Sequence, residues 1–374
     1  MKLLIIFGTR PEVIKLAPLI KLVQQEPNIE VVTCSTGQHR EMLDQALMVF
    51  GIKPDIDLGV MEENQTLASL TAILSTKISK CIAESQPDIV VVQGDTTTAF
   101  VASLMAFYVG IPVAHVEAGL RTGDINSPFP EEFNRITISR IAKWHFAPTV
   151  RAKANLILEN VNSNSIYLVG NTVIDALNIL AGDQKKVDAL KEVTSITPKR
   201  EFILITAHRR ENHGQGIHSL CQAIKELAAE FPSVDFIFPV HLNPNVKQVI
   251  NVELRDHSQI TLIEPVDFST MLYLESHAIL IMTDSGGIQE EAASFRTPVV
   301  VMREHTERGE GVAQGFAIVA GSTREGIVGA VKQYLNNPQI KKDLESALNP
   351  YGDGLAARRI LDVLANRNIE EFSR

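Results

Sequence analysis

Short unbroken runs of Val, Ile and Leu alternate with helical stretches along most of this chain, and this alternation restricts the fold more than any other feature. The runs at 3–7, 89–93, 202–206 and 279–283 carry hardly any polar residues. A half-exposed strand alternates apolar and polar side chains, whereas a strand buried on both faces of a parallel sheet does not. We therefore predict an α/β protein built from doubly wound parallel sheets that helices cover.

The predicted elements fall into two successive series of strand–helix units. Strands are expected at 3–7, 30–35, 89–93, 112–116, 144–147 and 166–169, and then at 202–206, 235–239, 260–263, 279–283, 298–302 and 317–319. We predict a Rossmann-like domain over 1–180 and a second over 181–374, whose final helical segment can pack back on the first domain. Ligands of such sheets bind beyond the carboxyl ends of the strands, so we expect the site there, in a crevice between the domains.

Charge and cysteine content exclude several classes of protein. The chain has a formal net charge of −9, and sequence-independent nucleic-acid binding needs a basic face, so we expect no nucleic-acid partner. No apolar run approaches the roughly 20 residues that cross a bilayer. Cys34, Cys81 and Cys221 are far apart and form no CxxC pair, which favours neither a zinc site nor a disulfide framework. We therefore expect a cytoplasmic protein without a membrane partner.

The loop after the first strand points to an anion site. Thr9 and Glu12 have the spacing of a capping box, which satisfies the free N–H groups at a helix start. Arg10 and Lys15 lie in the first turns of the same helix, whose dipole already favours an anion such as a diphosphate. The loop matches neither the dinucleotide-binding glycine motif nor the Walker motif, which disfavours a nicotinamide dehydrogenase and a nucleoside triphosphatase.

Three acids, Asp95, Glu117 and Glu131, lie at or just beyond the carboxyl ends of consecutive elements of the first series. Each has an ordinary explanation: Asp95 could cap a helix, and Glu131 could form a surface ion pair with Arg135. Converging carboxylates are also what proton abstraction from a difficult carbon requires. No His-x-x-x-His motif or dense acidic run accompanies them, so we expect no catalytic metal.

The second series ends its strands in residues that suit a nucleoside diphosphate. His208 and Arg209 follow its first strand and can donate hydrogen bonds to phosphate. A later strand runs into Ser-Gly-Gly at 285–287 and then a helix, so backbone N–H groups and the helix dipole can meet phosphate oxygens. Glu291 lies one turn deeper and could accept hydrogen bonds from ribose, and Arg308 could reach the same anion.

Taken together, these segments resemble the non-hydrolysing UDP-N-acetylglucosamine 2-epimerases over essentially the whole chain. Six motifs in this order are highly specific: Gly8-Thr9-Arg10-Pro11-Glu12 with Lys15, Gly94-Asp95-Thr96, Val116 to Gly123, Pro130-Glu131-Glu132 with Asn134-Arg135, His208 to Asn212, and Thr283 to Ala292. The resemblance implies a GT-B-like fold of two Rossmann-like domains with the active site between them. It also implies a UDP-sugar substrate, no cofactor, a homodimer and a place in polysaccharide biosynthesis.

The resemblance assigns roles to residues of this chain. Asp95, Glu117, Glu131 and His208 would be catalytic, with the three carboxylates around the sugar. Uracil would meet the loop at 264–271 through Val266 and Met271. By the resemblance, the residues that would hold the diphosphate are Arg10, Lys15, His208, Ser285, Gly286, Gly287 and Arg308, and Glu291 would hold the ribose. Arg135 and Arg209 are further candidates for substrate binding.

Two features depart from the family pattern. The family usually reads Thr-Glu-Arg-Pro-Glu where this chain has Gly309, and glycine leaves the preceding arginine less rigidly placed. Many bacterial members bind a second UDP-GlcNAc as an activator, and Gln38, His39 and Gln45 resemble part of that region. An arginine that often precedes Gln-Thr-Leu is Asn64 here, so an allosteric site stays an open hypothesis.

The implied reaction is the interconversion of UDP-GlcNAc and UDP-ManNAc. Carbon 2 of the sugar has no adjacent carbonyl, so its proton would leave together with UDP to give 2-acetamidoglucal, and re-addition would give the epimer. A GT-B glycosyltransferase would use the same nucleotide pocket with an acceptor. The further alternatives are a hydrolytic epimerase, an epimerase of a UDP-2,3-diacetamido sugar recognised by residues 121–130, and a non-catalytic UDP-sugar sensor.

Overall fold

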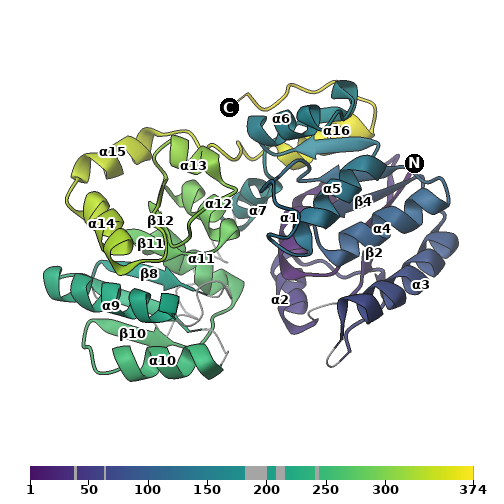
Figure 1. The fold of residues 1–374 in the computed structure, drawn as a ribbon. Helices are drawn as coiled ribbons and strands as arrows, with labels where there is room; N and C mark the ends of the chain where they lie inside the picture. Colours follow the sequence, from purple (N-terminus) through teal and green to yellow (C-terminus); the bar gives the residue numbers. More distant parts are fainter. Residues whose placement is uncertain (38–39, 63–64, 182–199, 208–214, 241–243, 374) are drawn as a thin grey trace. The chain divides into compact units, whose positions relative to one another are not determined.

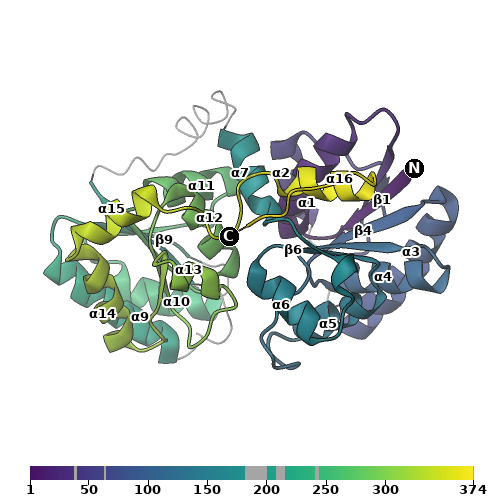
Figure 2. The same cartoon turned by 90° about the horizontal axis from the view of Figure 1, so that it is seen from above.

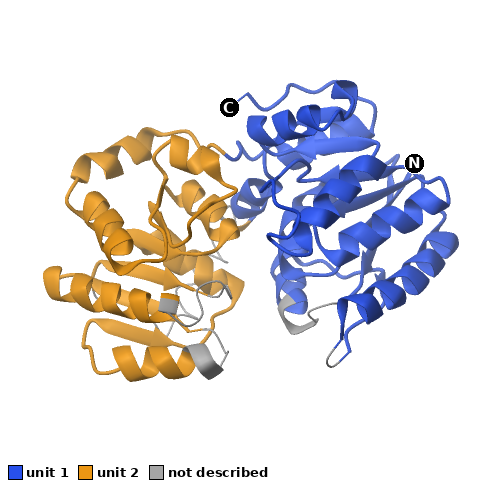
Figure 3. Ribbon diagram, in the orientation of Figure 1, with its two compact units in different colours: residues 1–179, 351–374 blue, residues 180–350 orange. Residues whose placement is uncertain are grey.

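The computed structural model describes residues 1–37, 40–62, 65–181, 200–207, 215–240 and 244–373 (Figure 1). The chain divides into two compact units, unit 1 with residues 1–179 and 351–374 and unit 2 with residues 180–350 (Figure 3). Each unit holds one sheet in which all the paired strands are parallel. The predicted α/β class with doubly wound parallel sheets is thereby confirmed.

The sheet of unit 1 has the strand order β3-β2-β1-β4-β5-β6-β7. Its strands are β1 (Lys2–Phe7), β2 (Glu30–Ser35), β3 (Ile56–Asp57), β4 (Ile89–Gln93), β5 (Val113–Val116), β6 (Trp144–Ala147) and β7 (Ile166–Leu168). Its helices are α1 (Arg10–Val23), α2 (Arg40–Phe50), α3 (Leu67–Ser85), α4 (Thr97–Tyr108), α5 (Glu131–Ile141), α6 (Val150–Leu158), α7 (Thr172–Ala181) and α16 (Ala356–Leu364). The order reverses between β1 and β4, which is the topological switch point where ligands of such sheets bind.

The sheet of unit 2 repeats this arrangement with the order β10-β9-β8-β11-β12-β13. Its strands are β8 (Phe202–Thr206), β9 (Asp235–Pro239), β10 (Ile260–Ile263), β11 (Leu280–Thr283), β12 (Val299–Val301) and β13 (Ala317–Val319). Its helices are α9 (Gln215–Glu230), α10 (Pro244–Leu254), α11 (Phe268–His277), α12 (Gly286–Phe295), α13 (Gly309–Ala313), α14 (Arg324–Leu335) and α15 (Pro338–Ser346). Its switch point lies between β8 and β11.

The central strands are buried on both faces, as their composition predicts. In β8, Ile203 and Ile205 pack into a cluster with residues of α9, α10 and α14. Phe202 and Leu204, which point to the other face, pack with residues of α11 and α12. Helices on both faces therefore enclose the sheet, and this burial explains the unbroken apolar runs.

The last helix, α16, belongs to unit 1 and packs against α1 (Figure 2). Asp175 of α7 accepts hydrogen bonds from the backbone N–H groups of Ala356 at 3.3 Å and Ala357 at 2.8 Å. The backbone N–H of Phe372 then donates to the carbonyl oxygen of Leu168 in β7 at 2.8 Å. Unit 2 therefore ends at Pro350, and the chain returns to unit 1.

All twelve predicted strands are present with bounds within one residue of those expected. Among the described residues, the strand β3, the 3-10 helix Ser163–Ser165 and the helix α7 have no counterpart in the prediction. The strand β3 has two residues, too few to show a pattern. The helix α7 is not predicted, although its buried residues Val173 and Leu177 have helical spacing.

Two cysteines that are distant in the sequence meet in the core of unit 1. The Sγ atoms of Cys34 and Cys81 lie 3.6 Å apart, and both thiols are free. Their separation along the chain does not predict this contact, because β2 and α3 come together only in the folded sheet.

Candidate functional site

The candidate residues of unit 1 follow three neighbouring strands at one edge of the sheet. The strand β4 pairs with β1 on one side and with β5 on the other. The carboxyl ends of parallel strands meet at the same edge, so the loops that begin at Gly8, Gly94 and Glu117 are neighbours. Arg10, half-buried, is the first residue of α1 and Lys15 lies further along the same helix.

Lys15 and Glu117 form a buried ion pair at this edge. The Nζ atom of Lys15 lies 2.5 Å from Oε2 of Glu117, and the two side chains are only 10% and 8% exposed. The Nε2 amide of Gln93 donates to the same oxygen at 2.6 Å. The backbone of Glu117 has a φ of +64°, a left-handed conformation that costs a non-glycine residue about 1–3 kcal/mol. Such strain concentrates at functional sites, which favours a role for Glu117.

Asp95 is held by residues of α5. Thr96 caps α4 by accepting the N–H of Ala99 at 3.0 Å, so the prediction that Asp95 is the helix cap is wrong. The Nη2 atom of Arg135 lies 2.5 Å from Oδ2 of Asp95. The Nδ2 amide of Asn134 donates to the carbonyl oxygen of Asp95 at 2.8 Å. Asp95 keeps 28% of its side chain exposed, so its carboxylate is anchored and still accessible.

The ion pair within α5 involves Glu132, and not Glu131 as the spacing suggests. The Nη1 atom of Arg135 lies 3.2 Å from Oε2 of Glu132, which is fully buried. The reason is geometric, because Glu132 and Arg135 share the buried face of α5. Glu131 is the first residue of the helix and is half-buried, which leaves its carboxylate accessible to a ligand.

Glu12 joins two of the site loops. It forms the predicted capping box, in which Oε2 accepts the N–H groups of Gly8 at 3.0 Å and Thr9 at 2.8 Å. Its other oxygen accepts the hydroxyl of Thr96 at 2.8 Å, which ties the loop after β1 to the loop after β4. Burial raises the pKa of Glu12 to about 7, although these hydrogen bonds act to lower it.

His115 of β5 supports the turn that carries Asp95. Its Nε2 atom lies 2.7 Å from the carbonyl oxygen of Gly94, whose φ is +72°. Burial lowers the pKa of His115 to about 3, so the ring is neutral and Nε2 carries the donated hydrogen. Sequence reasoning missed His115 and Glu132 as supporting residues, although each lies beside an acid that it singled out.

The corresponding edge of unit 2 is built on glycines. The strand β11 pairs with β8, and the hydroxyls of Thr206 and Thr283 lie 2.6 Å apart. Ser285 is the N-cap residue of α12, which begins at Gly286. The first N–H groups of a helix have no partner within it, so Gly286 and Gly287 can offer theirs to an anion.

Arg308 lies against the start of α12. A Cβ atom on Gly286 would lie 3.1 Å from Cζ of Arg308, so glycine permits the close approach of the guanidinium. The Nε atom of Arg308 donates to Oε1 of Glu290 at 3.0 Å, and its backbone N–H donates to the hydroxyl of Thr306 at 3.1 Å. These bonds hold the arginine in place despite the Gly309 that follows it.

A second buried carboxylate, Glu307, lies beside Arg308. Its Oε2 atom lies 3.0 Å from Nη1 of Arg303 and 3.8 Å from Nη1 of Arg308. Burial alone would raise the pKa of Glu307, but the two guanidinium groups outweigh it and lower the pKa to about 2. The loop before α13 therefore carries fixed charges at neutral pH.

The remaining described candidates of unit 2 lie beside Gly287, in the loop that follows β10, and in α11. A Cβ atom on Gly287 would lie 3.9 Å from both Oε1 of Glu291 and Oγ of Ser285, so these polar groups flank that glycine. Val266 and Met271 are half-buried and pack against the core beneath α11 and α12. These positions are compatible with the roles predicted for ribose and uracil, which stay predictions.

Some candidates lie outside the described residues. These are Gln38, His39, His208 and Arg209. Gln45 is described and lies exposed on α2.

The described part of the chain contains no group of three or more His, Cys, Asp or Glu side chains placed to hold a metal ion. No helix described there combines the length and the apolar character that crossing a membrane requires.

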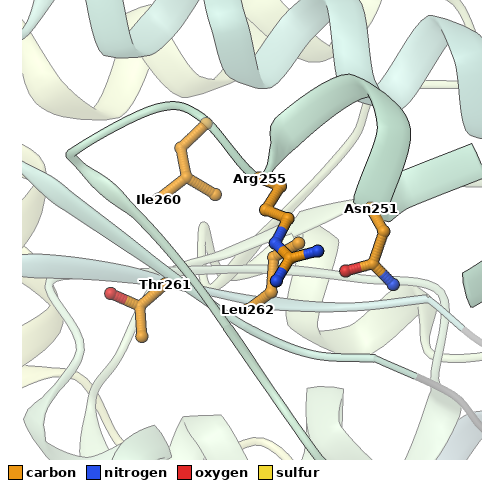
Figure 4. Close-up of a pocket in the computed structure, with 5 residues that line it drawn as sticks. All are labelled: Asn251, Arg255, Ile260, Thr261 and Leu262. Atoms are coloured by element: carbon orange, nitrogen blue, oxygen red, sulfur yellow. The ribbon is translucent and has the colours of Figure 1, made fainter.

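A pocket of about 640 Å³ lies elsewhere in unit 2 (Figure 4). Its lining comes from α10 and β10 and consists of Asn251, Arg255, Ile260, Thr261 and Leu262. The strand β10 is the edge strand, two strands away from the switch point, and the lining holds no acid. We therefore locate the candidate site at the switch points and not in this pocket.

Comparison with known proteins agrees with this geometry. A family model described as UDP-N-acetylglucosamine 2-epimerase matches residues 21–365. A UDP-N-acetylglucosamine 2-epimerase of Salmonella typhimurium is 45% identical over 374 residues, which cover 99% of this chain and 100% of that protein.

Two solved structures extend the likeness to the fold. UDP-GlcNAc 2-epimerase from Neisseria meningitidis, bound to UDP-GlcNAc, superimposes with a TM-score of 0.91 at 44% identity, covering 98% of this chain and 100% of that one. UDP-GlcNAc 2-epimerase from Methanocaldococcus jannaschii, in complex with UDP-GlcNAc and UDP, gives a TM-score of 0.84 at 35% identity, with coverage of 98% and 100%. The predicted GT-B-like class is confirmed, and the chain belongs to the UDP-N-acetylglucosamine 2-epimerase family of enzymes.

Proposed function

We propose that this protein interconverts UDP-GlcNAc and UDP-ManNAc by inverting carbon 2 of the sugar, without hydrolysis and without a cofactor. The observation that carries the proposal is the pair of anchored carboxylates, Asp95 and Glu117, which follow neighbouring strands at the switch point of unit 1. Membership of the family supports a sugar nucleotide as substrate, because the Neisseria relative was solved with UDP-GlcNAc.

The proposed reaction is an elimination followed by a re-addition. A base takes the proton of carbon 2, and the electron pair of that C–H bond forms a double bond between carbons 1 and 2. The bond between carbon 1 and the diphosphate oxygen breaks, and its electron pair leaves with UDP. Protonation of carbon 2 of the 2-acetamidoglucal from its other face, with attack of UDP on carbon 1, gives the epimer. Asp95, Glu117 and Glu131 are the groups we propose for proton transfer, each contributing roughly 10²–10⁴-fold. His208 is a further proposed catalytic residue, at the diphosphate.

We assign the nucleotide to residues of unit 2. Arg308 lies against Gly286 at the start of α12, and a guanidinium beside free backbone N–H groups suits a diphosphate. Ser285, Gly287 and Glu291 would extend this contact to the ribose, and Val266 and Met271 to the uracil. The other proposed substrate contacts are Arg10, Lys15, Arg135 and Arg209.

Product analysis by NMR in deuterated water, starting from UDP-GlcNAc alone, tests the proposal. We expect UDP-ManNAc with deuterium at carbon 2, because the proton that returns comes from solvent. Free ManNAc with UDP would show a hydrolytic epimerase instead. If UDP-GlcNAc reacts only when an acceptor is added, the protein is a glycosyltransferase. If UDP-GlcNAc does not react but a UDP-diacetamido sugar does, the substrate is that modified sugar nucleotide.

We also propose that the enzyme is a homodimer formed through α4. Phe100 and Leu104 are half-buried and Phe107 and Tyr108 are exposed, so the outward side of this helix is as apolar as its inward side. A helix that is apolar all round is normally buried, which suggests a second copy as the cover. Sedimentation velocity should give a dimer, and Phe107→Glu should shift it towards monomer.

A second UDP-GlcNAc as activator remains a proposal from resemblance alone. Saturation with UDP-ManNAc in the absence of UDP-GlcNAc tests it. A lag that added UDP-GlcNAc removes would support an activator, and normal turnover from the first seconds would contradict one.

A further inference from the structure

We propose that Glu132 is a positioning residue that fixes the loop at 122–123 and, through Arg135, the orientation of the Asp95 carboxylate. The inference rests on the proposed function, because the orientation of Asp95 affects turnover only if that acid takes part in the reaction. It concerns a residue that neither touches the proposed substrate nor lies at the surface.

The carboxylate of Glu132 is fully buried and has three polar contacts. Its Oε1 atom accepts the backbone N–H groups of Thr122 at 3.1 Å and Gly123 at 3.2 Å. Its Oε2 atom lies 3.2 Å from Nη1 of Arg135. A buried charge costs several kcal/mol unless it is paired, so a carboxylate in this place needs all of these partners. Because Glu132 is buried, its charge cannot be explained as that of a solvated surface residue.

Arg135 transmits this position to Asp95. Its guanidinium contacts two carboxylates: Nη1 lies 3.2 Å from Oε2 of Glu132, an ionic contact without hydrogen-bond geometry, and Nη2 lies 2.5 Å from Oδ2 of Asp95. The group is planar, so a partner that fixes one edge also sets the direction of the other edge. Arg135 is 7% exposed and Asp95 28%, which means that the support is buried and the supported acid is accessible.

The backbone around Asp95 is fixed separately. Asn134 donates to the carbonyl oxygen of Asp95 at 2.8 Å, and His115 lies 2.7 Å from the carbonyl oxygen of Gly94. Loss of Glu132 would therefore leave the main chain of this turn in place. What would change is the direction from which Arg135 approaches the Asp95 carboxylate.

The same carboxylate ties Asp95 to the loop at 122–127. From Thr122 the loop closes on itself, because the Thr122 hydroxyl donates to the carbonyl oxygen of Ser127 at 2.5 Å. A movement of this loop would shift Glu132 and, through Arg135, the acid. Glu132 thus couples the loop to the reacting group.

Turnover of Glu132→Gln, measured by deuterium entry at carbon 2, tests the inference. The amide keeps an acceptor for Thr122 and Gly123 but no longer holds Arg135. We expect kcat to fall about 10- to 100-fold with KM changed less than about 3-fold, since a misplaced group of about 1 Å can cost that much. Asp353→Asn is the matched control, because Asp353 pairs with Arg359 at 2.7 Å in the same unit without reaching Arg135 or the loop at 122–123; its kcat should stay at the wild-type value.

A double-mutant cycle separates positioning from general loss of structure. In an Asp95→Asn background, Glu132→Gln should cause no further loss of kcat, because the residue acts only through Asp95. An equal loss in both backgrounds, or wild-type kcat in the single variant, would overturn the inference. If Glu132→Gln does not fold, Arg135→Lys replaces it in the test, since an ammonium group cannot hold both carboxylates in fixed directions. Wild-type kcat in Arg135→Lys would also overturn the inference.

Two controls keep this test distinct from that of the proposed function. If wild-type enzyme exchanges no deuterium, the proposed function fails. Hydrogen exchange at the amides of Thr122 and Gly123 needs no turnover, and it should become faster in Glu132→Ala, which lacks the acceptor. Unchanged exchange would overturn the part of the inference that concerns the loop.

Discussion

The two units repeat one strand order around a switch point, yet they build different chemistry there. In unit 1 the edge is made of paired side chains, with Glu117 held by Lys15 and Asp95 held by Arg135. In unit 2 it is made of glycine backbone and one arginine that Glu290 holds. Topology therefore places the two edges alike, and under the proposed function the residues that follow each strand determine which part of the sugar nucleotide each unit binds.

If this division is correct, changes in the two units should affect different kinetic constants. The largest effect is expected for Glu117→Gln. An amide cannot accept the proton, so kcat should fall about 10²–10⁴-fold, while UDP affinity measured by calorimetry should change little. Full turnover would remove Glu117 from proton transfer, and a large loss of UDP affinity would argue against separate tasks for the two edges.

The sequence predicts the sheets well and the supporting contacts poorly, and β4 with its following loop shows why. The run Ile89–Gln93 is recognisable because burial on both faces leaves apolar residues at its first four positions. The partner of Asp95 is not, because Arg135 is 40 residues away and reaches it only after α5 has packed on the sheet. Local signals such as the capping box at Thr9 and Glu12 are predictable, since both partners lie within one helical turn.

The acids of the two edges should also respond to pH in opposite ways. The pKa of Glu12 is raised from 4.5 to about 7, so its proton is held more tightly in the folded state. Its contribution to the free energy of unfolding is complete below pH 4.5 and is lost as pH rises to about 7. The pKa of Glu307 is lowered from 4.5 to about 2, so its contribution is complete above pH 4.5 and is lost as pH falls to about 2.

Urea unfolding of wild type and of the amide variants from about pH 2 to about pH 8 measures both contributions. Relative to Glu12→Gln, wild type should lose up to about 3 kcal/mol of unfolding free energy as pH rises from 4.5 to about 7. Relative to Glu307→Gln, wild type should lose a similar amount as pH falls. Differences that do not vary with pH, or that have the same sign for both variants, would contradict the contrast between the edges.

A smaller effect is expected on UDP affinity from Gly286→Ala. The added methyl group would lie 3.1 Å from Cζ of Arg308 and would displace the guanidinium. We expect the dissociation constant of UDP to rise about 10- to 100-fold, which corresponds to one lost charge-assisted hydrogen bond. Gly329→Ala in α14 is the matched control, because nothing lies within 4 Å of its Cβ position. Equal affinities for the two variants would place the diphosphate elsewhere.

The smallest effect is expected where the chain departs from the family, at Gly309. This residue is the first of α13, a position at which proline is favourable because no helical N–H bond is lost. Gly309→Pro should raise the free energy of unfolding by about 0.4–1 kcal/mol, since it restricts the unfolded chain. UDP affinity should stay within about 2-fold, because Glu290 and Thr306 already hold Arg308. A clear gain in affinity would mean that these two bonds leave the arginine loose and that rigidity at the unit 2 edge depends on the backbone after all.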